Sequence, residues 1–242
     1  MEARSVRSVP IAILVSAVSF LCLQIAWHFV VSRPEAHAQA LPPAPSRAAL
    51  AAASLGEPIA AAQTLALWLQ TFDHQPGISI PLRDLDYSNV IEWLARIIEL
   101  DPRGQYPLLL ATRLYAQVPD EARQRQMLEF AYREFFADPD RRWPWLAHAA
   151  VTAKHRLRDL PLALKYAQAI SKHATGPAVP HWAQQMPIFI LEEMGEIESA
   201  RILLGALLAN GTVTDPGEIR FLTGRLHDLE QKAVEKSPLP VK

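Results

Sequence analysis

The chain begins with one unbroken apolar run and continues with helices that are apolar on one side only. From residue 10 to residue 31 there is no Asp, Glu, Lys or Arg. About 21 apolar residues at 1.5 Å per residue form a helix of roughly 32 Å, which matches the hydrocarbon core of a bilayer. The run therefore predicts one transmembrane helix over residues 10–31, preceded by a short N-terminus of residues 1–9.

Beyond residue 58, apolar residues recur at positions i, i+3, i+4 and i+7, the pattern of a helix buried on one face. Three stripes stand out, each in the second helix of a predicted pair. They are Tyr87, Val90, Ile91, Leu94, Ile97 and Ile98; Leu160, Ala163, Leu164, Ala167 and Ile170; and Ile197, Ala200, Leu204, Leu207 and Leu208. Only residues 78–80 alternate with the period of a strand. The pattern predicts an all-α fold.

The predicted helices form pairs joined by short turns. We expect pairs at residues 58–72 with 87–100, 104–117 with 120–137, 142–157 with 159–174, and 180–194 with 196–209. A last helix at residues 216–234 would cap the open end, because terminal repeats need a polar outer face. Its polar residues are Asp228, Glu230, Gln231, Lys232, Glu235 and Lys236. The helical domain then spans residues 58–235, and residues 236–242 are expected to form a flexible tail.

Prolines divide these pairs at a regular interval. Successive prolines are separated by 37, 38 and 39 residues at Pro102, Pro139, Pro177 and Pro216. Because proline blocks the continuation of a preceding helix, we interpret each one as following a helix end. Trp145 and Trp182 share the interval of 37 residues. An interval of this length that recurs indicates an internal repeat.

Two segments, Leu160–Ala167 and Gly195–Ala200, resemble the turn and second-helix start of tetratricopeptide repeats, and Glu99–Pro102 resembles the end of such a repeat. The resemblance covers residues 58–235 in architecture. The interval departs from the family's 34 residues, and the Trp-Leu-Gly-Tyr pattern of its first helix is absent. The resemblance implies a right-handed superhelical solenoid of about four helical hairpins plus a capping helix. Such a solenoid has a concave surface, lined largely by first helices, that binds extended peptides.

The segment between the apolar run and the helical domain, residues 32–57, is rich in Ala, Pro and Ser and lacks Phe, Trp and Tyr. Its part at Pro42, Pro43 and Pro45 favours an extended chain, so we expect a semi-rigid spacer there that lifts the domain off the bilayer. The alanine stretch that follows is compatible with a helix. The first helix beyond it is apolar on more than one side, at Leu67, Trp68, Leu69 and Phe72. Either the linker folds back over this helix or a partner covers it.

The charges that flank the apolar run predict its orientation. Arg4 and Arg7 precede the run and Arg33 follows it, which places the N-terminus in the cytoplasm. The layout resembles bacterial inner-membrane proteins that carry a periplasmic repeat domain, so the helical domain is expected in the periplasm. The alternative is a signal peptide, cleaved near residues 38–40 so that the protein is secreted, because Ala-x-Ala sites occur at residues 36–38 and 38–40.

Composition argues against several functional classes. A net charge of −1 argues against a nucleic-acid binder, and Cys22, the single cysteine, excludes an internal disulfide. The chain contains no G-x-S-x-G, H-E-x-x-H or P-loop motif, so we expect neither an enzyme nor a bound cofactor. His148 and His155 would lie about 10 Å apart along one helix, too far for one metal ion. We interpret the acidic residues Glu192, Glu193, Glu196 and Glu198 as a solvated surface.

The third predicted hairpin is basic. Residues 141–175 contain seven Lys and Arg residues and only one acid, Asp159. One face of its first helix is expected to bind a partner, with a groove for an acidic segment or a chain-terminal carboxylate. The candidate residues are Arg141, Arg142, Trp145, His148, Lys154 and His155, with Thr152 in the same stripe. The alternative is a solvated basic face, with Trp145 packed between repeats.

These patterns together predict a membrane-anchored scaffold for protein–protein interaction or assembly that faces the periplasm. Its expected partners are the lipid bilayer, through residues 10–31, and other envelope proteins or peptides, including acidic segments. The alternative is a regulatory or substrate-presenting subunit of a cell-envelope enzyme complex. Such a subunit would co-purify in equal amounts with one enzyme, whereas a general scaffold would bring down several partners.

Overall fold

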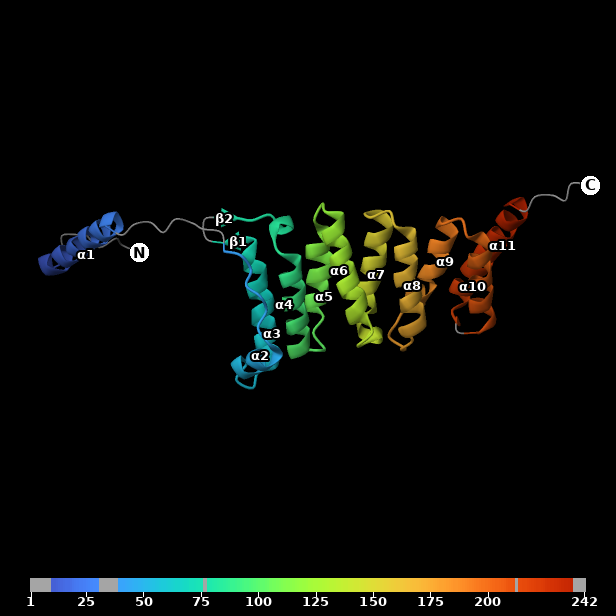
Figure 1. Cartoon of the computed structure of the whole chain (residues 1–242), viewed down its shortest axis with the longest axis horizontal. Coiled ribbons are helices and arrows are strands. Elements are labelled where there is room, and N and C mark those ends of the chain that lie inside the picture. Colours follow the sequence, from blue (N-terminus) through green and yellow to red (C-terminus); the bar gives the residue numbers. More distant parts are fainter. Residues whose placement is uncertain (1–9, 31–38, 76–77, 212, 237–242) are drawn as a thin grey trace, which may run out of the picture. The chain divides into compact units, whose positions relative to one another are not determined.

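The computed structural model describes residues 10–30, 39–75, 78–211 and 213–236. It divides into two units, one with the N-terminal helix α1 and the other with helices α2 to α11 (Figure 1). The only strands in the described residues are β1 (His74–Gln75) and β2 (Ile78–Ser79), which pair with each other. The all-α prediction is confirmed, including the extended character at residues 78–80.

Helix α1 (Ile11–Val30) consists of apolar and uncharged polar residues, all exposed in the structure. Its 20 residues give a length of about 30 Å. The Ser16 hydroxyl donates a hydrogen bond to the Ala12 carbonyl at 2.9 Å, which satisfies this polar group inside the helix. Among the described helices, α1 is the one that by itself is long and apolar enough to cross a membrane. The predicted N-terminal apolar helix is therefore confirmed.

The remaining helices follow the predicted boundaries within a few residues, except α2, which had no predicted boundaries, and α5, which is a short α-helix continued by other helical turns to residue 117. They are α2 (Arg47–Ala53), α3 (Pro58–Leu69), α4 (Tyr87–Leu100), α5 (Tyr106–Leu109), α6 (Glu121–Phe135), α7 (Pro139–His155), α8 (Leu160–His173), α9 (His181–Glu193), α10 (Ile197–Ala209) and α11 (Pro216–Lys236). Short 3₁₀ turns η2 (Gln70–Phe72), η3 (Leu82–Asp84) and η5 (Tyr115–Gln117) and a π-helical turn, η4 (Leu110–Leu114), extend or join them. From α6 to α11, each helix packs against the next in sequence (Figure 1).

Aspartates start the second helices of three pairs. Asp86 accepts a hydrogen bond from the Ser88 N–H at 2.9 Å at the start of α4. Asp120 does the same at the start of α6, as does Asp159 at the start of α8. These carboxylates satisfy backbone donors that have no partner inside the helix. The sequence therefore encodes the turns as well as the buried stripes.

Two of the four regularly spaced prolines begin helices, so interpreting all four as following helix ends was wrong. Pro139 is the first residue of α7, and Pro216 is the first residue of α11. Proline suits this position because the N–H that it lacks would have no partner there. Pro102 and Pro177 lie in the connections after α4 and α8, as predicted. All four prolines thus mark boundaries between helix pairs.

Contacts recur between residues whose separation in the chain is close to the predicted repeat interval. Lys165 reaches Glu129 across 36 residues, and the Gly176 N–H reaches the Asp140 carboxylate across the same separation. Aromatic rings meet in the same way, with centroids 5.2–5.3 Å apart, in the pairs Tyr132–Tyr166, Trp143–Trp182 and Phe136–His173. Stacked repeats would bring equivalent positions together in this manner. The superhelical solenoid and its repeat number stay predictions.

The apolar interior consists of two clusters. The larger extends from Leu41 to Ile190, and the smaller joins α9, α10 and α11. Ala163, Ala167 and Ala200 are fully buried where helices cross. Small side chains at these positions let the helix axes approach closely, which agrees with the predicted stripes.

The segment around Pro42–Pro45 is non-helical and the alanine stretch forms α2, as the sequence allowed, but residues 39–57 belong to the helical unit, so the prediction that they form a spacer away from it is wrong. Leu41 is buried, and its carbonyl accepts a hydrogen bond from the Asn89 side chain at 3.0 Å. The indole N–H of Trp93 donates to the Pro42 carbonyl at 2.8 Å. These contacts with α4 hold the segment against the domain. The predicted cover over the first helix is not present at Leu67 of α3, which is 61% exposed. Residues 32–38 lie outside the described residues.

Candidate functional site

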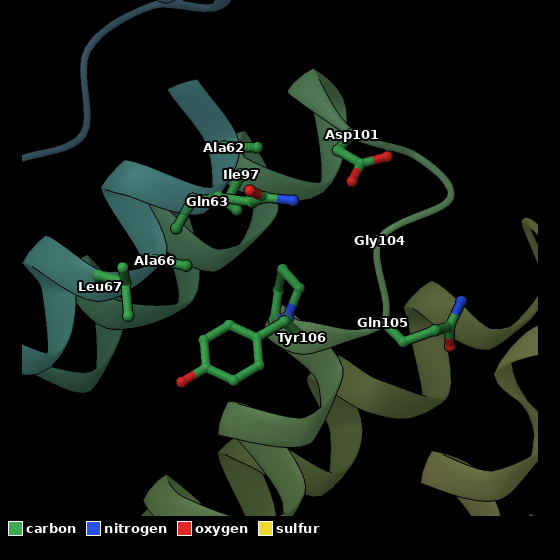
Figure 2. Close-up of a pocket in the computed structure, with 10 residues that line it drawn as sticks. Ala62, Gln63, Ala66, Leu67, Ile97, Asp101, Gly104, Gln105 and Tyr106 are labelled. Atoms are coloured by element: carbon green, nitrogen blue, oxygen red, sulfur yellow. The ribbon is translucent and has the colours of Figure 1, made fainter. Parts of the chain in front are cut away.

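An apolar pocket of about 400 Å³ lies between α3 and the connection that leads from α4 into α5 (Figure 2). It is lined by Ala62, Gln63, Ala66 and Leu67 of α3, by Ile97 and Asp101, and by Gly104, Gln105, Tyr106 and Pro107. The Leu67 side chain is 61% exposed although it is large and apolar. Figure 2 shows the Tyr106 ring facing Ala66 and Leu67, while Gln105 points away. The pocket offers apolar surface to solvent.

Local sequence explains how this pocket is shaped. The carbonyl of Asp101 accepts the Gly104 N–H at 3.0 Å, which closes a tight turn after α4. A Cβ atom at Gly104 would lie 2.7 Å from the Asp101 carboxylate and 3.2 Å from the Asp101 carbonyl oxygen, so a larger residue there would displace the Asp101 side chain. The Tyr106 hydroxyl donates to the Gln70 side chain at 3.2 Å and ties α5 to η2. These contacts hold both walls of the pocket in place.

Arg142 cannot serve as a partner-binding residue, which corrects the sequence prediction. Its side chain is 2% exposed, and it forms an ion pair with the Glu134 carboxylate at 3.1 Å. The guanidinium also donates to the Glu134 carbonyl and, at 3.1 Å, to the Pro102 carbonyl. The helical pattern placed Arg142 near an exposed stripe, but the end of α6 and the turn after α4 enclose it. Arg142 therefore joins three successive segments.

The other predicted basic residues of this hairpin are largely matched by acids. Arg141 pairs with Asp138 at 3.1 Å, and Lys154 pairs with Glu193 of α9. On the adjoining helix, Lys165 of α8 pairs with a glutamate of α6 at 3.2 Å. The excess positive charge of residues 141–175 is thus shared with acids of neighbouring hairpins. It does not form a free basic groove at these positions.

The aromatic and histidine members of the predicted site do not converge on one point. Trp145 donates its indole N–H to Gln105 at 2.7 Å and lies between hairpins, as the alternative interpretation expected. His148 is half-buried, and its Nε2 atom has no hydrogen-bond partner. Burial, followed by the charge of Arg113, lowers the pKa of His148 below its ordinary value. His155 is exposed. Within the residues the structure describes, no three His, Cys, Asp or Glu side chains gather as a metal site.

Glu192 is not part of a solvated surface, contrary to the sequence interpretation. Its side chain is 11% exposed and accepts hydrogen bonds from Arg225 at 2.6 Å and Lys232 at 2.8 Å. Burial raises the pKa of Glu192, but the two bases outweigh this effect and hold the pKa below its ordinary value. These contacts fasten α11 to α9. The acids around it are separately paired, Glu193 with Lys154 and Glu198 with an arginine of α10.

The α3–α5 pocket was not identified from the sequence. Its only signal was the excess of apolar residues in α3, including Leu67, which predicted a cover for that helix. Tyr106 lines the pocket because of the turn after α4, and the spacing of apolar residues along a helix does not predict the geometry of such a turn.

The chain has no counterpart in three comparisons with known proteins. No protein-family model matches the sequence. No curated protein is significantly similar to it, and no solved structure matches its fold. The resemblance to tetratricopeptide repeats therefore stays a prediction from short motifs.

Proposed function

We propose that this protein is a membrane-anchored scaffold that binds other cell-envelope proteins through a solenoid of tetratricopeptide-like hairpins facing the periplasm. The observation that carries the proposal is the α3–α5 pocket, in which Leu67 and Tyr106 present apolar surface to solvent. An exposed apolar pocket on a helical surface fits an apolar side chain of a partner. The helix α1 supports the anchor, since its length and composition suit a bilayer.

The arrangement of contacts supports a binding scaffold in a second way. Partners about 36 residues apart in the chain lie next to each other, as in Lys165 with Glu129. Repeat arrays with such neighbour contacts build long continuous surfaces that suit extended segments of other proteins. The pocket would hold one anchor side chain of such a segment.

Photo-crosslinking in native membranes tests this function. A benzophenone amino acid replaces Leu67 in the full-length protein, and a second variant carries it at Gln168, an exposed position on α8. We expect specific adducts at Leu67 and none at Gln168. One stoichiometric adduct would identify a dedicated complex, and several adducts would identify a general scaffold.

A blocking variant makes the test specific for the pocket. Gln63→Trp places a large ring at the pocket wall, whereas Thr64→Trp adds the same ring at an exposed neighbour that does not line the pocket. We expect Gln63→Trp to abolish the Leu67 adducts and Thr64→Trp to leave them. Adducts that occur equally at Gln168, or that survive Gln63→Trp, would contradict the proposal.

A further inference from the structure

Most basic side chains of the helical unit are paired with an acid. Examples are Arg96 with Glu99 at 2.8 Å and Arg125 with Asp159 at 2.6 Å. In the part of the chain that the structure describes, no acid lies within ion-pair distance of Arg113 or Arg156. Other exposed bases, such as Arg103 and Arg133, also have no acid within ion-pair distance in the described residues, so the lack of a partner alone does not mark a site. Arg113 and Arg156 differ from these two arginines in their position, because one lines a pocket and the other contacts a residue that lines it.

Arg113 lines another pocket, which we name the Arg113 pocket. It has a volume of about 350 Å³ and is lined by Pro81, Leu82, Arg83, Arg113, Leu114, Gln117, Val118 and Pro119. Arg156 reaches across from the end of α7 and donates to the carbonyl of the lining residue Gln117 at 3.0 Å. Two arginines from segments distant in sequence, Arg83 and Arg113, thus line the pocket, and a third, Arg156, is bonded to one of its lining residues.

The third arginine, Arg83, is also available to a ligand. Its contact with Asp84 is 3.7 Å long, and both side chains are more than half exposed. Such an exposed pair contributes little stability, so a carboxylate from a partner can replace it at small cost. Arg113 exerts its charge locally, since it helps to lower the pKa of the adjacent His148.

The apolar residues and the arginines of the Arg113 pocket would bind different parts of the same ligand. Leu82, Leu114 and Val118 provide apolar surface that would be buried against an apolar side chain. Guanidinium groups bind carboxylates with charge-assisted, often bidentate hydrogen bonds. The pocket therefore suits a ligand that carries one carboxylate next to one apolar group.

We propose that the Arg113 pocket binds a protein segment in which an aspartate or glutamate side chain adjoins a large apolar side chain. The inference rests on the proposed scaffold function and assigns the chemistry of one partner segment. It also relocates the predicted acidic-segment site, because Arg141, Arg142 and Lys154 are held by acids of this chain.

The surroundings favour a single carboxylate over an extended anionic surface such as a membrane. Asp84 and Asp120 follow directly after the pocket residues Arg83 and Pro119. With Asp86 they line another recess, in which three acids outnumber one base, Arg123. A continuous layer of negative charge would be repelled by these acids, whereas one side chain can contact the arginines and avoid them.

The test uses full-length protein in mild detergent and an array of octapeptides. Every peptide is acetylated and amidated, so that a side chain supplies the only carboxylate. The central residues combine Asp, Glu, Asn or Gln with Leu, Phe, Trp or Ala in each order. We expect the tightest binders to pair an acid with Leu, Phe or Trp, and the amide counterpart to bind about tenfold more weakly.

Matched arginine variants then assign the site. Arg113→Gln and Arg156→Gln should each weaken the acidic peptides about tenfold and bring them close to the amide peptides. Arg103→Gln and Arg133→Gln, at exposed arginines that do not line the pocket, should leave binding unchanged. Circular dichroism checks that each variant is folded.

Three results would overturn the inference. They are an array in which no acidic peptide binds more tightly than its amide counterpart, equal losses in the Arg103→Gln control, and binding that appears only when the C-terminus is left as a free carboxylate. If adducts at Leu67 persist while the array fails, the scaffold function stands and this partner chemistry is wrong. If the array succeeds while the Leu67 adducts are absent, the pocket assigned to the scaffold function is wrong.

Discussion

Replacing the buried Arg142 with alanine should destabilise the fold rather than weaken a binding site. The substitution removes the guanidinium that donates to the Pro102 carbonyl and leaves the Glu134 carboxylate without its partner, whereas the Glu134 carbonyl keeps the backbone N–H of Ala137 as a donor. A buried acceptor without a donor costs about 1–3 kcal/mol, and breaking a buried ion pair costs about 3–5 kcal/mol. The Glu134 side chain is 27% exposed, so water recovers part of this loss. We expect a loss of about 3–4 kcal/mol in the free energy of unfolding.

The neighbouring Arg141 provides a matched control. Its side chain is 46% exposed, and its ion pair with Asp138 joins residues three apart. Exposed pairs of this kind contribute about 0.3–0.5 kcal/mol, so Arg141→Ala should be nearly neutral. Arg142→Lys should fall between the two because lysine keeps the charge but cannot bind three acceptors with one planar group.

Urea unfolding of the full-length chain in mild detergent, monitored by circular dichroism, measures the difference in the free energy of unfolding between the variants. A loss of about 3–4 kcal/mol corresponds to a decrease of roughly 10 °C in the melting temperature for a domain of this size. If Arg142→Ala and Arg141→Ala differ by less than about 1 kcal/mol, the reasoning from burial is wrong. Normal stability combined with loss of partner adducts would instead support the sequence-based role of Arg142 in binding.

Three further predictions concern the cap, the folded-back segment and the topology. Glu192→Gln should lower the protection of the α11 amides against hydrogen exchange, because it removes the charge that binds Arg225 and Lys232. Since the Glu192 pKa lies below its ordinary value of 4.5, its stabilisation is complete above pH 4.5 and is lost as the pH falls through the lowered pKa. Protection factors, which correct for the pH dependence of intrinsic exchange, would contradict this if they were equal at pH 3 and pH 7. Trp93→Phe removes one hydrogen bond and should make proteolytic cleavage within residues 39–57 about fivefold faster, whereas unchanged cleavage would show that the contact is dispensable. In a Cys22→Ser background, Gln168→Cys should react with a membrane-impermeant maleimide after the outer membrane is permeabilised, and reaction only after the inner membrane is broken would reverse the predicted orientation.

Local patterns in the sequence determined the helices. The stripes containing Val90, Leu94 and Ile97 identified the buried face of α4, and all three residues are buried. Asp120 and Asp159 marked helix starts because a carboxylate satisfies free backbone donors at such positions. The unbroken apolar run identified α1 in the same way. Each of these features depends on residues within one or two helical turns, which is why periodicity and capping chemistry are sufficient.

The tertiary structure alone decided which charges are matched and which remain available. A helical period indicates the direction of a side chain relative to its own helix, but it does not indicate which group meets it. Arg142 donates to the Pro102 carbonyl, 40 residues away, and is buried inside the fold, whereas Arg113 has no acid within ion-pair distance in the described residues. Residues 39–57 became part of the domain because Trp93, 51 residues beyond Pro42, supplies a donor. Burial and charge pairing depend on such distant partners, so the pockets follow from the packing of the helices and not from their patterns.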